Sequence, residues 1–175
     1  MHPLGAAGSD AERNLKLAIQ TALAGDPGVW LAFGGQVLAA GAVSKQHSQD
    51  ERAFVQAGAL TAPLPAAPRY DLSKTVGLVT LSPGLSPRAL AAQLGTLDGA
   101  VLRVFGAGTM PDALVEALVG FKGKPMVAVS QCLAGGLEPG AYAAGAGLWA
   151  AGVENGGQMS PEQALARLHL RLSAP

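Results

Sequence analysis

Apolar residues recur along the first part of the chain with a spacing that changes from helical to extended. In residues 11–24 (AERNLKLAIQTALA) the apolar side chains return every three or four positions, which predicts a helix. Residues 29–43 hold two short apolar runs on either side of Gly34 and Gly35, a pattern typical of a β-hairpin. This part of the chain is therefore expected to form a helix followed by a hairpin.

The periodic pattern is lost in residues 57–75. This stretch is rich in alanine and proline and shows neither a helical nor a strand period over any length. Such a composition is typical of a linker. We therefore expect two structural parts, residues 1–56 and 76–175, joined by this segment.

After the linker, apolar runs of strand length alternate with helical patterns. This alternation is typical of a parallel sheet with right-handed crossovers, covered by helices. The predicted fold class is α/β: a C-terminal three-layer domain with a small parallel sheet, preceded by the helix and hairpin. Strands are expected at residues 76–81, 99–105 and 125–131, and helices from Ser86 onward and over 111–121, 141–151 and 161–172.

Ligands of parallel sheets bind where the strands end at their carboxyl edge. The glycine turn after the second expected strand, Gly106-Ala107-Gly108, lacks the third glycine of a dinucleotide fingerprint and the lysine of a phosphate loop. Two interpretations remain: a tight strand-to-helix turn, or a site where backbone N–H groups and the Thr109 hydroxyl donate to a small polar ligand. Thr109 and Asp112 are also spaced as a helix N-cap pair.

Other reactive side chains do not assemble into a catalytic or metal-binding pattern. Cys132 follows the third expected strand but has no histidine partner in sequence reach, so its default interpretation is a small buried residue. Glu138 and Glu154 lie on expected loops, where carboxylates are usually solvated. No metal site or cofactor is predicted, because His2, His47 and His169 lie in three different segments and share no ligand spacing. His169 is expected at the surface or at a helix end.

Composition narrows the range of partners. The 12 Lys and Arg residues balance the 12 Asp and Glu residues, which argues against nucleic-acid or membrane binding by bulk charge. The single cysteine excludes an internal disulfide and favours a reducing compartment. With no secretion signal visible in residues 1–5, we expect a cytoplasmic protein that acts on a small molecule or on another protein.

Several stretches together resemble one family, the bacterial-type asparaginase/glutaminase amidohydrolases, and more closely their cytoplasmic type I branch. The resemblance covers essentially the whole chain, and the segment that begins with Gln131 and Cys132 is its most specific part. The stretches that carry it are VGLVTLSPGLSP, VLRVFGAGTMP, SQCLAGGLEPGAYAAG and AAGVENGGQMSPEQALARLHLRL, with GSDAERNLKLAIQTAL and VWLAFGGQVL upstream.

The resemblance implies a domain assignment and a reaction. Residues 1–56 would be the back part of the family's N-terminal domain, and residues 76–175 its C-terminal domain. The complete enzymes convert L-asparagine and water to L-aspartate and ammonia. Their catalytic threonines lie in Thr-Gly-Gly-Thr-Ile and His-Gly-Thr-Asp-Thr motifs, and neither motif occurs here. No catalytic residue is therefore carried over, and we expect this chain alone to be inactive.

The resemblance also implies contacts to substrate. In the family, the C-terminal domain helps to close the active site of a neighbouring subunit through an asparagine at the position of Thr109, so this chain departs from the pattern there. Gln131 and Cys132 match a region near a second, regulatory asparagine site of type I members, and Glu138 is a further candidate. The implied partners are L-asparagine or a related amino acid, and either further copies of the chain or a complementary N-terminal chain. The alternative is a non-catalytic amino-acid-binding or regulatory module.

Overall fold

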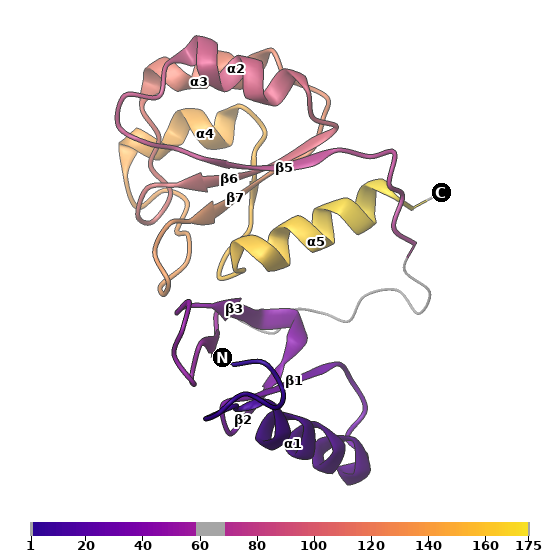
Figure 1. Cartoon of the computed structure of the whole chain (residues 1–175). Helices are drawn as coiled ribbons and strands as arrows, with labels where there is room; N and C mark the ends of the chain where they lie inside the picture. The colour runs from indigo at the N-terminus through magenta and orange to yellow at the C-terminus, as the bar shows by residue number, and fades with distance from the viewer. Residues whose placement is uncertain (1, 59–68, 175) are drawn as a thin grey trace. The chain divides into compact units, whose positions relative to one another are not determined.

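The computed structural model describes residues 2–58 and 69–174 and divides into two compact units, Met1–Thr61 and Ala62–Pro175 (Figure 1). The middle of the expected linker, residues 59–68, lies outside the described residues. Within the described ranges, none of the helices combines the length and the apolar character that a membrane span requires.

The first unit opens with helix α1 (Ala11–Ala24), which ends at Gly25 in the left-handed conformation. Strands β1 (Trp30–Phe33) and β2 (Gln36–Ala39) follow as an antiparallel pair. The connecting glycines, Gly34 and Gly35, have φ of 57° and 76°, the positive values that a two-residue hairpin turn requires. The predicted helix and hairpin are both confirmed.

A second antiparallel pair in this unit was not expected from the sequence. A 3₁₀ turn, η1 (Ala40–Ala42), leads into β3 (Val43–Lys45), which pairs with β4 (Phe54–Gln56). The Phe54 ring packs edge-to-face against Phe33 of the hairpin, with ring centroids 5.2 Å apart. This aromatic contact connects the two small sheets of the first unit.

The second unit is an α/β domain built on one parallel sheet, whose strands are hydrogen-bonded in the order β5-β6-β7-β8. The predicted fold class is therefore confirmed. Its elements in chain order are β5 (Val76–Thr80), α2 (Pro87–Gly95), β6 (Gly99–Val104), α3 (Asp112–Val119), β7 (Met126–Ser130), the 3₁₀ turn η2 (Ala143–Gly145), α4 (Ala146–Ala150), β8 (Glu154–Asn155) and α5 (Pro161–Leu172).

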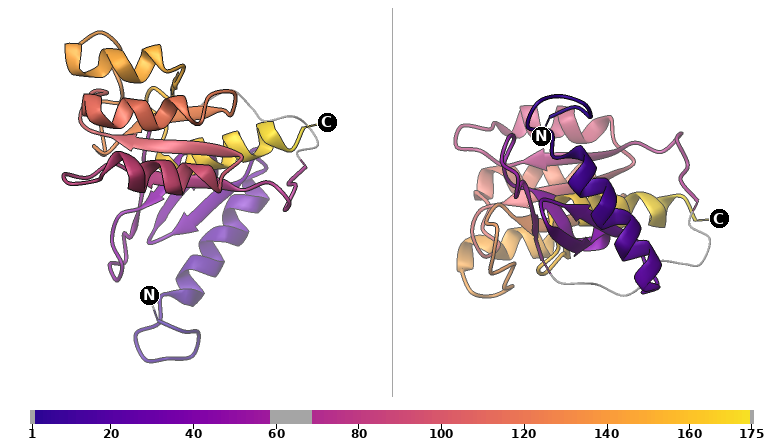
Figure 2. Two further views of the ribbon diagram at one scale, coloured as in Figure 1. Left: turned by 90° about the horizontal axis from the view of Figure 1, so that it is seen from above. Right: turned by 60° about the horizontal axis from the view of Figure 1, so that its bottom comes forward.

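Helices cover both faces of this sheet. Helices α2, α3 and α4 lie on one side and α5 lies on the other (Figures 1 and 2). Successive residues of β6 point to opposite faces. Leu102 and Val104 therefore join the larger core cluster with α2 and α3, whereas Val101 packs in a smaller cluster with Ala164 and Leu168 of α5. The core of the second unit thus lies in two layers, one on each face of the sheet.

One sequence expectation near the end of the chain needs correction, and another is met in one of its two alternatives. The expected helix over 141–151 is shorter, because its first residues form the turn η2 and only Ala146–Ala150 are α-helical. His169 lies in the last turn of α5, the second of the two places expected for it, and its side chain is buried. Its ring stacks on Tyr70, with centroids 3.6 Å apart and planes 4° apart. This stack attaches the beginning of the second unit to the end of α5.

Candidate functional site

The glycine turn after β6 closes on itself. Phe105 and Thr109 form an isolated antiparallel bridge: the N–H of Thr109 donates to Phe105 O at 3.0 Å, and the N–H of Phe105 donates to Thr109 O at 3.2 Å. Gly106 and Gly108 take φ of 50° and 123°, which side chains rarely adopt, so the turn depends on glycine at both positions.

Thr109 interacts with its own turn. Its hydroxyl donates to Phe105 O at 3.3 Å, and the same oxygen accepts the N–H of Gly108 at 3.0 Å. In this conformation, three of the expected donors are used within the turn: the Thr109 hydroxyl and the N–H groups of Gly108 and Thr109. Thr109 also does not cap the following helix, because α3 begins at Asp112 with Pro111 in the N-cap position.

The end of β7 is joined to this turn by a buried serine. Ser130 Oγ donates to Gly106 O at 2.6 Å and accepts the N–H of Cys132 at 3.0 Å. One hydroxyl therefore satisfies a carbonyl of the β6 turn and an N–H of the β7 loop. The sequence indicated residues 130–136 as one of the strand-end segments where a ligand could bind, but the Ser130 side chain was not among the predicted site residues.

Gln131 joins the ends of three neighbouring strands. Its side-chain Nε2 donates to Leu81 O at 2.7 Å and to Arg103 O at 3.0 Å, and its backbone N–H donates to Val104 O. Leu81 follows β5, Arg103 lies in β6 and Gln131 follows β7. The amide therefore fixes the relative positions of the strand ends from which the candidate loops leave.

Cys132 and Glu138 are on the loop that follows, and both are exposed. The expectation that Cys132 is a small buried residue is thus wrong, because the chain leaves the sheet at Ser130. The N–H of Glu138 donates to Ala107 O at 2.9 Å, which holds this loop against the glycine turn. The fold therefore places four candidate residues at one edge of the sheet: Thr109, Gln131, Cys132 and Glu138.

An arginine of β6 adds a charge close to the same edge. Arg103 is half-buried, and its Nε is fully buried with no hydrogen-bond partner among the described residues. A buried donor without a partner carries a desolvation cost, and an anionic or polar ligand could offset it. Sequence reasoning did not single out Arg103, although a charged residue in the apolar run GAVLRVF was a signal for it.

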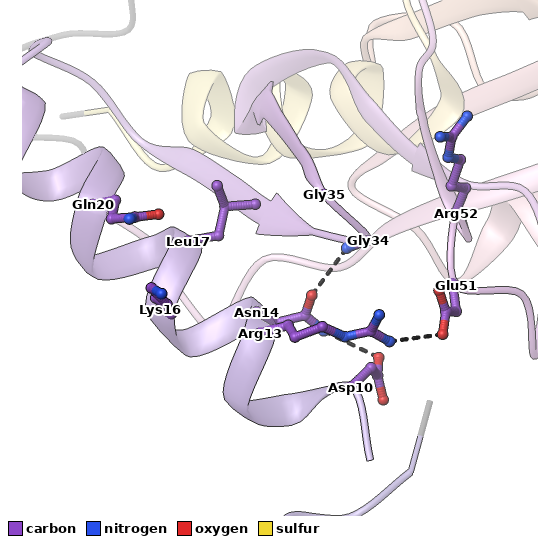
Figure 3. Close-up of a pocket in the computed structure, with 10 residues that line it drawn as sticks. All are labelled: Asp10, Arg13, Asn14, Lys16, Leu17, Gln20, Gly34, Gly35, Glu51 and Arg52. Atoms are coloured by element: carbon purple, nitrogen blue, oxygen red, sulfur yellow. Dashed lines mark hydrogen bonds and ion pairs between the residues drawn. The ribbon is translucent and has the colours of Figure 1, made fainter. Parts of the chain in front are cut away.

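The first unit contains a separate pocket of about 460 Å³ between α1, the hairpin turn and the loop before β4 (Figure 3). Its polar groups bind one another. Asn14 Oδ1 accepts the N–H of Gly34 at 3.0 Å, Asn14 Nδ2 donates to Asp10, and Arg13 pairs with Glu51 at 2.8 Å. These contacts attach α1 to the hairpin turn and to the loop before β4, so the polar side chains of the pocket connect elements of the first unit.

Asp10 is the most buried acidic residue of this joint. The backbone N–H of His2 donates to its carboxylate at 2.9 Å and lowers the pKa of Asp10 below its ordinary value, with a further contribution from Asn14. The carboxylate is therefore charged at neutral pH and accepts hydrogen bonds from both neighbours. Its role is consistent with positioning the start of α1.

The fold and the strand-end loops define the class of protein: a two-unit α/β protein whose polar candidates gather at the carboxyl edge of a parallel sheet. Comparison with known families matches residues 75–175 to the Glutaminase/Asparaginase C-terminal domain and residues 1–64 to the Asparaginase, N-terminal family. The chain belongs to the glutaminase/asparaginase family.

Individual relatives agree with this assignment. The chain is 33% identical to the L-asparaginase of Thermococcus kodakarensis over 96% of its own length, and it superposes on a solved structure of the thermostable enzyme with a TM-score of 0.88. It is 34% identical to L-asparaginase 1 of Escherichia coli over 56% of its length. A structure of L-asparaginase I from Vibrio cholerae superposes with a TM-score of 0.81 at 30% identity.

These relatives are considerably longer than the chain. The chain spans 58% of the Thermococcus enzyme by sequence and 59% by structure, and its match spans 30% of the Escherichia coli enzyme. The relatives therefore contain sequence that these 175 residues do not match, and the activity of a complete asparaginase is a separate question from membership of the family.

Proposed function

We propose that the chain is the C-terminal part of an L-asparaginase-type amidohydrolase, which hydrolyses L-asparagine to L-aspartate and ammonia only together with a segment that carries the catalytic threonines. The match to the Thermococcus L-asparaginase over 96% of the chain is the observation that supports this most strongly. Neither threonine motif of the family occurs in the 175 residues, so the nucleophile must come from elsewhere. The reducing environment favoured by the single cysteine is consistent with a cytoplasmic enzyme.

In this proposal the carboxyl edge of the second unit contributes to an active site completed by another subunit or by a complementary chain. Thr109 and Glu138 are the candidate contacts, since the loop of Glu138 is hydrogen-bonded to the turn of Thr109. A threonine hydroxyl can donate to a substrate oxygen once it leaves Phe105 O, at the loss of one weak hydrogen bond of 3.3 Å.

The first test is ammonia release from millimolar L-asparagine. The purified chain is expected to release no more ammonia than a mock-purified control. The same chain is expected to release ammonia when the N-terminal portion of the Thermococcus enzyme is co-expressed with it. A Thr109→Val variant in the mixture is expected to be slower by about tenfold, on the scale of one lost hydrogen bond to substrate.

Release by the chain alone would contradict this proposal, because it would require a nucleophile outside the two threonine motifs. L-Glutamine, assayed in parallel, would define the amide preference of the complex. The molecular mass of the active complex in solution would tell how many copies of this chain it contains.

A second candidate function is non-catalytic binding of an amino acid, which Arg103 favours because its Nε is buried without a hydrogen-bond partner among the described residues. Its guanidinium is the natural partner of a ligand carboxylate, and Gln131 and Cys132 follow the adjacent strand. Calorimetric titration with L-asparagine and L-aspartate is expected to show binding without turnover. Arg103→Met should abolish it, whereas Arg88→Met, which removes an exposed arginine of α2, should not.

A further inference from the structure

The described residues of the first unit form no cluster of large buried hydrophobic side chains. Of its described residues, the buried hydrophobic ones are three alanines, Ala42, Ala53 and Ala57, and helix α1 buries no residue. Its large apolar side chains are either half-buried, as Phe33 and Phe54 are where they pack on each other, or exposed. A unit of about 60 residues with so little buried apolar area does not reach the stability of an ordinary domain without further support.

The exposed side chains on α1 form one stripe. Leu15, Ile19 and Leu23 are 58%, 52% and 82% exposed, and their i, i+4, i+8 spacing aligns them along one side of the helix. The side that carries Asn14 and Arg13 is attached to the hairpin turn and to the loop before β4 (Figure 3). Helix α1 is thus connected on its polar side, while its apolar stripe has no cover among the described residues of the unit.

The hairpin is incomplete in a similar way. Trp30 and Val37 lie on one face of it, 41% and 40% exposed, and β1 and β2 form a sheet of only two strands. Two-stranded sheets are marginally stable in water, and their outer edges present unpaired backbone groups. Apart from each other, the helix and the hairpin thus have no apolar neighbour among the described residues of the unit that covers Leu15, Ile19, Leu23, Trp30 and Val37.

The comparison with longer relatives indicates which segment is a candidate to cover the apolar stripe of α1. The N-terminal family matches only residues 1–64 of the chain, and about two fifths of the Thermococcus enzyme has no counterpart in the 175 residues. We propose that the stripe formed by Leu15, Ile19 and Leu23 is the docking surface for the portion of an asparaginase N-terminal α/β domain that lies outside these residues. The inference rests on the proposed function, because that portion would also bring the threonine motifs.

The test uses two adjacent substitutions on α1. Ile19→Lys introduces a charge into the middle of the stripe, and Gln20→Lys introduces the same charge at an exposed position beside the pocket. The probe is the N-terminal portion of the Thermococcus L-asparaginase, co-expressed with each version of the tagged chain so that both parts can fold together. Circular dichroism of each purified chain is the control for folding.

The unaltered chain and the Gln20→Lys variant are expected to co-purify with the probe and to bind it equally, whereas Ile19→Lys should bind it roughly 100-fold more weakly. Equal binding by Ile19→Lys, or no binding by the unaltered chain, would overturn the docking surface. Self-association that Ile19→Lys abolishes, without any effect on the probe, would overturn it in favour of a second copy of the chain.

Binding and ammonia release separate this inference from the proposed function. A complex that forms through the stripe but releases no ammonia would retain the docking surface and contradict the enzyme proposal. Ammonia release that Ile19→Lys leaves unchanged would retain the enzyme proposal and contradict the docking surface.

Discussion

The Ser130 hydroxyl donates a hydrogen bond of 2.6 Å to the carbonyl oxygen of Gly106, and it joins the end of β7 to the glycine turn that follows β6. The same oxygen accepts the N–H of Cys132. Ser130 is buried, so removal of its hydroxyl takes away two hydrogen bonds that lie inside the fold, although Gly106 and Cys132 are themselves exposed. This contact is therefore central to the geometry of the candidate edge.

Ser130→Ala is expected to lower the free energy of unfolding by about 1–3 kcal/mol, because it leaves a carbonyl and an N–H without their partner. Ser82→Ala, at an exposed position after β5, should change it by less than about 0.5 kcal/mol. Urea denaturation of both variants checks the difference. Equal stability of the two would mean that water replaces the hydroxyl without loss.

Gly145→Ala is expected to destabilise the second unit by roughly 1–3 kcal/mol, on the scale of an overpacked core. Its φ of −98° suits any residue, so the cost is steric: a Cβ there would collide with the carbonyl oxygen of Gly108. Gly95→Ala is the matched control, because a Cβ at Gly95 meets no atom within 4 Å, and helix propensity should favour the alanine by about 0.5–1 kcal/mol. Thermal unfolding of the two variants should shift in opposite directions.

The hydroxyl and the backbone N–H of Ser73 donate to Asp71 at 2.7 Å and 2.9 Å and hold the pKa of Asp71 below its ordinary value of 3.8. Since the folded-state pKa is the lower one, the stabilisation is fully present above about pH 4 and is lost as the pH falls through the folded pKa. Ser73→Ala should raise the pKa of Asp71 toward 3.8 in an NMR titration. An unchanged pKa of Asp71 in this variant would mean that the Ser73 hydroxyl does not contribute to lowering it.

Arg103→Met is expected to leave the free energy of unfolding unchanged or to raise it by up to about 1 kcal/mol, because the side chain buries an Nε without a partner. Arg171→Met removes an exposed pair with Glu154, at 2.6 Å and 2.9 Å, and should cost at most about 1 kcal/mol. Denaturant titration compares the two variants. A large loss in Arg103→Met would show that the arginine supports the fold rather than a ligand.

The elements that could be predicted from the sequence are those with a strong local signal. Residues 11–24 carry a helical period over nearly four turns, and Gly34-Gly35 can form the turn that a two-residue hairpin needs. The three long strands of the second unit are continuous apolar runs between glycine and proline turns. In each case the information lies within about 15 neighbouring residues.

The missed elements depend on distant contacts. Strands β3 and β4 are three residues long, too short for alternation to be visible, and they pair across a polar loop. Strand β8 has two residues and exists because Glu154 and Asn155 pair with β7. The Gly145 backbone packs against Gly108 at the start of the expected helix over 141–151, a constraint that no local period reveals.

The location of the candidate site could be predicted from the sequence, but the hydrogen bonds among its residues could not. The carboxyl edge follows from the order of strands and helices, and Thr109, Gln131, Cys132 and Glu138 all lie along it. Which donor uses which acceptor depends on loop geometry. The sequence could not tell that the Gln131 amide would span two strands or that Thr109 would bond to Phe105.

The distribution of core residues between the two units determines which part of the chain could be exchanged between genes. Every side chain in the two core clusters of the sheet, from Val76 to Leu172, belongs to the second unit. Recombination near the linker could transfer that unit to another gene without leaving its interior unfilled. Among the described residues of the first unit, the buried hydrophobic ones are three alanines, so under the docking proposal this unit would have to be inherited together with the portion that covers α1.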